Sequence, residues 1–172
     1  MSLMPATQPL DPWRWLGLPA LACLAATLVV ATPLRVFGLQ LPEPVFAVPL
    51  AFAWAVIRPS ILAPFALLLL GLALDLFWRT PVGLWALSLL AAYAATLAVR
   101  RVLSGLGWWG LAGWYLAATT WAMGAAWLIT LFLDHASPSP WAVLWQYLAS
   151  LALYPLAWGL IDRFEDADVR FR

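Results

Sequence analysis

Apolar runs separated by short polar breaks are the main feature of the sequence. The breaks carry charges, prolines or both, as at Glu43, Arg58, Arg79 and Asp134. Because a bilayer core about 30 Å thick is crossed by roughly 20 apolar helical residues, long runs of this kind predict transmembrane helices. The pattern predicts six of them, over 16–37, 45–57, 61–78, 82–99, 107–133 and 141–161.

The second run, 45–57, is short for a full crossing. A tilted helix, an extension into Leu41 and a partly re-entrant segment are all compatible with its length. Arg58-Pro59 ends the run, because a residue that precedes proline avoids helical backbone angles.

The composition leads to the same class of protein. Hydrophobic residues make up 65% of the chain and charged residues only 10%, against about 25% charged residues in soluble domains. The mean hydropathy is +0.90. We therefore expect an all-α integral membrane protein, with one transmembrane domain over 1–161 and a short charged cytoplasmic tail over 162–172. A net charge of +1 gives no reason to expect a nucleic-acid partner.

The arginines predict the orientation in the membrane. If both termini are cytoplasmic, the outer side holds only Arg35 and Arg79. The inner side then holds the other seven, Arg14, Arg58, Arg100, Arg101, Arg163, Arg170 and Arg172. This positive-inside bias favours six crossings with cytoplasmic N- and C-termini.

Few residues are suited to catalysis or metal binding. His135 and Cys23 are the only histidine and cysteine, and there is no lysine. The sequence has no G-x-S-x-G elbow, no G-x-x-x-x-G-K-[ST] loop and no zinc-ligand spacing. We expect no catalytic residue, no cofactor and no metal. A membrane enzyme would instead need polar side chains that converge on Asp75 or His135.

Asp75 lies near the end of the third predicted helix, where a carboxylate is costly unless a partner group or water receives it. Arg79 is four residues on, so in a continuous helix the two side chains share a face and are able to pair. Such a pair would close the outer end of the helix. Alternatively, Asp75 contacts a partner protein or lines a polar pocket.

Small residues at helical spacing mark one face in each of two predicted helices. The faces comprise Ser88, Ala92 and Thr96 in the fourth helix, and Gly113, Ala117, Thr120 and Gly124 in the fifth. Such faces let helices approach closely in lipid. Packing within the chain and packing against another subunit both explain them.

One segment, 54–93, carries an ordered set of motifs: an Arg-Pro after an aromatic-rich helix, a further proline, a G-L-x-x-D helix, a P-x-G turn and an apolar A-L stretch. The residues are Arg58, Pro59, Pro64, Gly71, Leu72, Asp75, Pro81, Gly83, Ala86 and Leu87. In this order the segment resembles the bacterial rod shape-determining protein MreD family, as does the Tyr154-Pro155-Leu156 break in the last helix. Arg79 departs from the family, which more often has a small residue such as glycine there.

The resemblance implies a non-enzymatic scaffold of the bacterial inner membrane that helps to control cell shape. MreD-like proteins bind MreC in the lateral peptidoglycan elongation complex, with MreB, RodA and a penicillin-binding transpeptidase. Arg58, Asp75, Arg79 and the Pro81-Gly83 turn would shape or present the contact surface.

The family fold is similar to that of the substrate-binding subunits of energy-coupling-factor transporters. A small-molecule-binding membrane subunit of such a transporter is therefore the alternative function. It would need a polar-rimmed cavity between helices.

Overall fold

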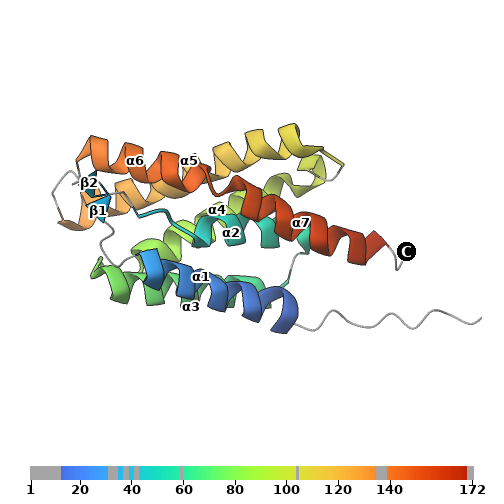
Figure 1. Ribbon diagram of the computed structural model, residues 1–172, viewed down its shortest axis with the longest axis horizontal. Helices are drawn as coiled ribbons and strands as arrows, with labels where there is room; N and C mark the ends of the chain where they lie inside the picture. The colour runs from blue at the N-terminus through green and yellow to red at the C-terminus, as the bar shows by residue number, and fades with distance from the viewer. Residues whose placement is uncertain are drawn as a thin grey trace, which may run out of the picture.

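The computed structural model describes residues 13–30, 35–36, 39–40, 43–58, 60–103, 105–134 and 139–169, which form a helical bundle (Figure 1). A π-helical turn, Trp13–Gly17, leads into α1. Two strands, β1 and β2, form a minimal antiparallel pair in which Val36 lies opposite Leu39. The bounds are α1 Leu18–Val30, β1 Arg35–Val36, β2 Leu39–Gln40, α2 Ala47–Ile57, α3 Leu62–Trp78, α4 Leu84–Leu103, α5 Trp108–Asp134, α6 Pro140–Leu151 and α7 Tyr154–Val169.

The prediction of a helical chain is confirmed, and the length and composition of its helices support the prediction of a membrane protein. Within the described ranges, four segments are long and apolar enough to cross a membrane, Trp13–Val30, Leu84–Leu103, Trp108–Phe132 and Pro140–Phe164. The other two, α2 with 11 residues and α3 with 17, are shorter apolar helices. At ~1.5 Å of rise per residue, α2 covers only about half of a bilayer core. A full count of six crossings stays a prediction.

Two predicted helices differ from the structure. The first was predicted to reach residue 37, but α1 ends at Val30 and Arg35 already lies in a strand. The last predicted helix, 141–161, is divided into α6 and α7. Pro155 has no N–H to donate to the carbonyl of Leu151, so the helical ladder is interrupted there. Beyond this break α7 continues to Val169, and most of the predicted tail 162–172 is therefore helical.

The short helix α2 is the centre of the bundle. Nine of its 11 residues are buried, and it packs against α4, α7, α3, α5 and α1. In Figure 1, α2 and α4 lie between the α1–α3 pair and the α5–α6 pair. A helix that is apolar all round is typical of such a buried position.

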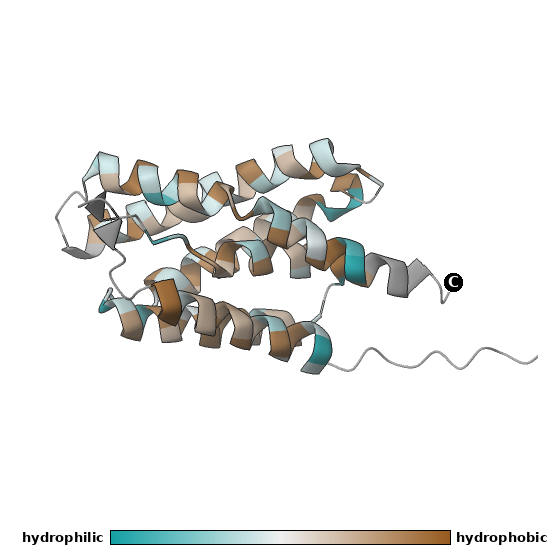
Figure 2. Cartoon of the chain, in the orientation of Figure 1, coloured by the Kyte–Doolittle hydropathy of each residue, from teal (hydrophilic) through white to brown (hydrophobic). Residues whose placement is uncertain are grey.

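Successive helices from α1 to α5 alternate in direction (Figure 1). The start of α1 and the ends of α2, α4 and α7 therefore lie at one end of the bundle, which brings Arg14, Arg58, Arg100 and Arg163 to that end. Figure 2 shows the most hydrophilic colour at the start of α1, in the α3–α4 turn, near the end of α4 and in the middle of α7. The orientation in the membrane was predicted from the arginines, four of which lie at this one end of the bundle, and it stays a prediction.

Candidate functional site

The α3–α4 hairpin brings together most of the residues that carried the resemblance. Gly71 and Asp75 lie on α3, and Arg79, Pro81 and Gly83 form the turn into α4. Pro64 lies in the first turn of α3, at the other end of the hairpin. Arg58 lies at the end of α2 and is exposed, whereas Pro59 is outside the described residues.

Asp75 caps the neighbouring helix. The residue is 1% exposed, and its carboxylate accepts three hydrogen bonds, from the Thr80 hydroxyl at 2.9 Å, the Gly83 N–H at 2.8 Å and the Trp85 N–H at 2.9 Å. Gly83 immediately precedes α4 and Trp85 lies in its first turn, and backbone N–H groups at the start of a helix have no partner within it. A negative charge is also favoured at this end of a helix. Hydrogen bonds from the turn and from the start of α4 therefore stabilise the buried carboxylate, whose partners the sequence did not identify.

Arg79 does not pair with Asp75. It has a left-handed backbone conformation, with φ 54°, and its N–H donates to the carbonyl of Asp75. Because α3 ends at Trp78, the continuous helix that would align the two side chains is absent. The Arg79 side chain is exposed, and the described part of the chain contains no ion pair between these residues. The left-handed region favours glycine, so a glycine would adopt this backbone conformation with less strain than Arg79 does.

At Gly71 the backbones of α3 and α4 are in contact. A Cβ atom on Gly71 would lie 2.3 Å from the Cα of Ala86 and 2.5 Å from its nitrogen. The rings of Trp78 and Trp85 pack edge to face beyond this point, with centroids 5.4 Å apart. Close contact at Gly71 and capping by Asp75 thus fix the spacing and the register of the hairpin.

A second polar contact lies at the opposite end of α4. Arg100 donates from Nε to the carbonyl of Val56 at 3.0 Å and from Nη2 to the carbonyl of Ile57 at 3.1 Å. The carbonyls at a helix C-terminus have no partner within the helix and favour a cation. Sequence reasoning assigned Arg100 only to the inner arginines. The signal available was a cation at the end of the predicted helix 82–99, which runs parallel to 45–57 if successive helices alternate in direction.

Arg100→Met should lower the free energy of unfolding by about 1–2 kcal/mol, because two charge-assisted hydrogen bonds are lost at a half-buried site. Unfolding in mild detergent, followed by tryptophan fluorescence, measures this change. Arg100→Lys keeps the charge but lacks the planar fork that reaches two carbonyls, so it should recover only part of the loss. Full recovery by lysine would show that charge alone matters.

The break between α6 and α7 is held by hydrogen bonds that the sequence did not indicate. The Tyr115 hydroxyl donates to the carbonyl of Ser150 at 2.7 Å, and the Val45 N–H donates to the Ser150 hydroxyl at 3.0 Å. In lipid, backbone groups freed by a helix break need such partners. Across the described residues, no buried side-chain nitrogen or oxygen lacks one.

The two small-residue faces have different environments. Ser88, Ala92 and Thr96 of α4 are buried within the bundle, as the packing interpretation predicted. The other face, formed by Gly113, Ala117, Thr120 and Gly124 of α5, is exposed. A Cβ atom on Gly113 or on Gly124 would meet nothing within 4 Å. The Thr120 hydroxyl lies 2.9 Å from the Tyr147 hydroxyl of α6, so α6 reaches this face at Thr120, whereas the two glycines of the face are open.

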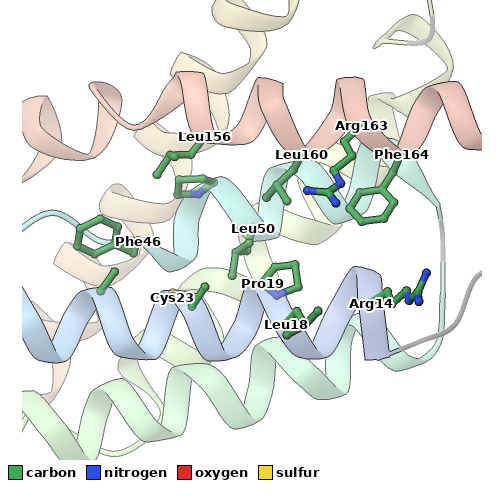
Figure 3. Close-up of a pocket in the computed structure, with 13 residues that line it drawn as sticks. Arg14, Leu18, Pro19, Cys23, Phe46, Leu50, Leu156, Leu160, Arg163 and Phe164 are labelled. Carbon is green, nitrogen blue, oxygen red and sulfur yellow. The ribbon is translucent and has the colours of Figure 1, made fainter.

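A cavity of about 830 Å³ lies between α1, α2 and α7 (Figure 3). Its walls are mostly apolar, and of the described motif residues only Leu156, from the break in the last predicted helix, lines it. Among the described residues, no group of three His, Cys, Asp or Glu side chains is placed to hold a metal ion. His135 is outside these residues.

Comparisons of the chain with protein-family models, with curated proteins and with solved structures give no match.

Proposed function

We propose that the chain is a non-enzymatic scaffold of the bacterial inner membrane that binds MreC and helps to organise lateral peptidoglycan elongation and cell shape. The proposal starts from the resemblance of 54–93 to MreD. The observation that carries it is the structural role of three motif residues. Gly71, Asp75 and Gly83 hold α3 and α4 together and do not line the cavity. This is the arrangement expected of a protein whose task is to present helix surfaces.

The exposed α5 face is the surface that we assign to a partner helix. Small residues at helical spacing let a second backbone approach closely, and close packing drives helix association in lipid. Gly113 and Gly124 lie at the two ends of this face and have open space above them. The cytoplasmic termini and the six crossings belong to the same proposal and rest on the distribution of the arginines.

Copurification tests the proposed function. With a tag on the C-terminus and extraction in mild detergent, we expect recovery of MreC together with RodA and a penicillin-binding transpeptidase. Failure of MreC to copurify from the native membrane, with the chain itself intact, would contradict the proposal. Recovery of an ATPase pair would contradict it in favour of the transporter subunit.

Gly113→Leu/Gly124→Leu should reduce MreC recovery about tenfold, since bulky side chains on a close-packed face cost at least ~1.4 kcal/mol. The matched control is Gly159→Leu on α7, because Gly159 is also exposed and also has nothing within 4 Å of its Cβ position. Recovery and the unfolding midpoint of each variant are compared with wild type. Equal recovery from both variants would remove the α5 face from the proposal.

The transporter alternative is favoured by one observation, the 830 Å³ cavity. Its volume lies within the range of ligand pockets, roughly 300–1,000 Å³. The walls are apolar, however, and an energy-coupling-factor subunit for a polar vitamin would need several convergent polar groups. A tightly bound vitamin-like molecule in the purified protein would move this alternative to first place.

A further inference from the structure

The cavity between α1, α2 and α7 is a groove with a polar end. Cys23 from α1, Leu50 from α2 and Leu160 from α7 line its apolar part. Arg14, in the π-helical turn before α1, and Arg163 of α7 line one end, as Figure 3 shows. Both α1 and α7 pack on α2, whereas they are not closely packed on each other. The groove therefore opens between α1 and α7.

Only cations contribute charge to the described wall of the groove. Arg14 and Arg163 are exposed, and no described acidic side chain lines the wall. Asp162 is exposed next to Arg163 in the sequence but is not part of the lining. Two guanidinium groups at one end of an apolar groove match a phosphate attached to a hydrocarbon chain, because guanidinium binds phosphate oxygens in a planar fork.

We propose that this groove is a binding site for an anionic phospholipid, with the phosphate between Arg14 and Arg163 and an acyl chain along the apolar wall. An acyl chain alone gains little here, since the surrounding lipid is equally apolar. Selectivity therefore comes from the arginines, each of which contributes about 1 kcal/mol toward anionic lipid near the membrane surface.

A lipid fits the groove better than a partner helix does. A transmembrane helix about 10 Å across and 30 Å long occupies roughly 2,400 Å³. This is more than the cavity holds, whereas a single acyl chain is much thinner than a helix. A partner helix also has no general need for two cations at one end, whereas the headgroup of an anionic lipid has. The site is separate from the α5 face, so the inference does not depend on the identity of the protein partner.

Native mass spectrometry of the full chain tests the proposal, with phosphatidylglycerol and phosphatidylcholine added in equal amounts. We expect several-fold higher occupancy by phosphatidylglycerol, and an apparent affinity about thirtyfold weaker in Arg14→Gln/Arg163→Gln, since ~1 kcal/mol is lost at each of the two arginines. Arg58→Gln is the control, because Arg58 is exposed but does not line the groove. Excess inorganic phosphate should not displace the lipid.

A second variant tests the apolar wall. Leu160→Trp keeps both arginines and narrows the groove, so it should lower the occupancy by phosphatidylglycerol as well. Each variant is first shown to be monodisperse and to unfold at the wild-type midpoint. Equal binding of the two lipids, or wild-type affinity in the double arginine variant, would overturn the proposal. A photo-crosslinking experiment with diazirine-labelled phosphatidylglycerol gives a further check. If the groove cross-links to a copurifying protein and not to the labelled lipid, the proposal is overturned as well.

Discussion

Asp75→Ala should lower the free energy of unfolding by about 3 kcal/mol, because it leaves three donors without an acceptor at ~1 kcal/mol or more each. The donors are the Thr80 hydroxyl and the N–H groups of Gly83 and Trp85. Water has little access to Asp75 itself, which is 1% exposed. Titration of the purified protein from mild detergent into a denaturing one measures the change, with tryptophan fluorescence as the signal.

Two further variants apportion this effect. Thr80→Val removes one of the three hydrogen bonds and should cost only about 1 kcal/mol. Asp75→Asn keeps one acceptor oxygen but directs an amide donor at the other donors, so its cost should lie between those of Thr80→Val and Asp75→Ala. If Asp75→Ala unfolds at the wild-type midpoint, the capping role is wrong.

The same variant separates two explanations of any functional effect. A buried carboxylate whose hydrogen bonds are all within the hairpin does not itself contact a partner. Loss of MreC recovery in Asp75→Ala should therefore accompany the loss of stability. Lost recovery in a variant of normal stability would favour the other interpretation, in which Asp75 contacts the partner directly.

Asp75 also shows how far the sequence leads. A carboxylate at the end of an apolar run is costly in lipid, and this fact alone predicts that some group receives it. The groups that do so are chiefly the backbone N–H groups of Gly83 and Trp85. Every residue except proline has such a group, so the residue types in the sequence do not point to these two. Arg79 was the visible candidate, but the turn that begins there places its side chain in solvent.

Periodicity and run length predicted α3, α4 and α5 to within a few residues, because long apolar runs between charges have few alternative structures in a membrane. The central position of α2 was not predicted. A run of 10–14 apolar residues is compatible with a buried helix, a tilted crossing and a re-entrant segment alike. Which of these forms depends on the helices packed around it.

The small-residue faces illustrate a second limit. Ala92 of α4 is buried, whereas Ala117 of α5 is exposed, although both belong to faces of small residues at helical spacing. A small residue is equally suited to close packing and to an open surface in lipid. Whether such a face is buried or exposed therefore depends on the arrangement of the helices, and the composition of the face does not predict it. The α1–α7 groove is likewise invisible in the sequence, since Arg14 and Arg163 are far apart in the chain.

Gly71→Ala should lower the free energy of unfolding by about 2 kcal/mol, within the range of 1–3 kcal/mol for overpacking. Alanine is the better helix former by roughly 1 kcal/mol, so the expected loss is the balance of that gain and a larger cost of separating the two backbones. The added Cβ would lie 2.3 Å from the Cα of Ala86. Because a backbone atom has no alternative rotamer, α3 and α4 must move apart at this point, which also disturbs the Asp75 cap one helical turn away.

Two substitutions make this prediction specific. Gly124→Ala on α5 adds the same methyl group where nothing lies within 4 Å, so it should be neutral or stabilising by up to about 1 kcal/mol. Ala86→Gly in the Gly71→Ala background removes the side chain of Ala86 but leaves the backbone atoms that the new Cβ meets. It should therefore fail to restore stability. Restoration would show that a side chain and not the backbone limits the approach, and the hairpin would then owe its spacing to Ala86 rather than to Gly71.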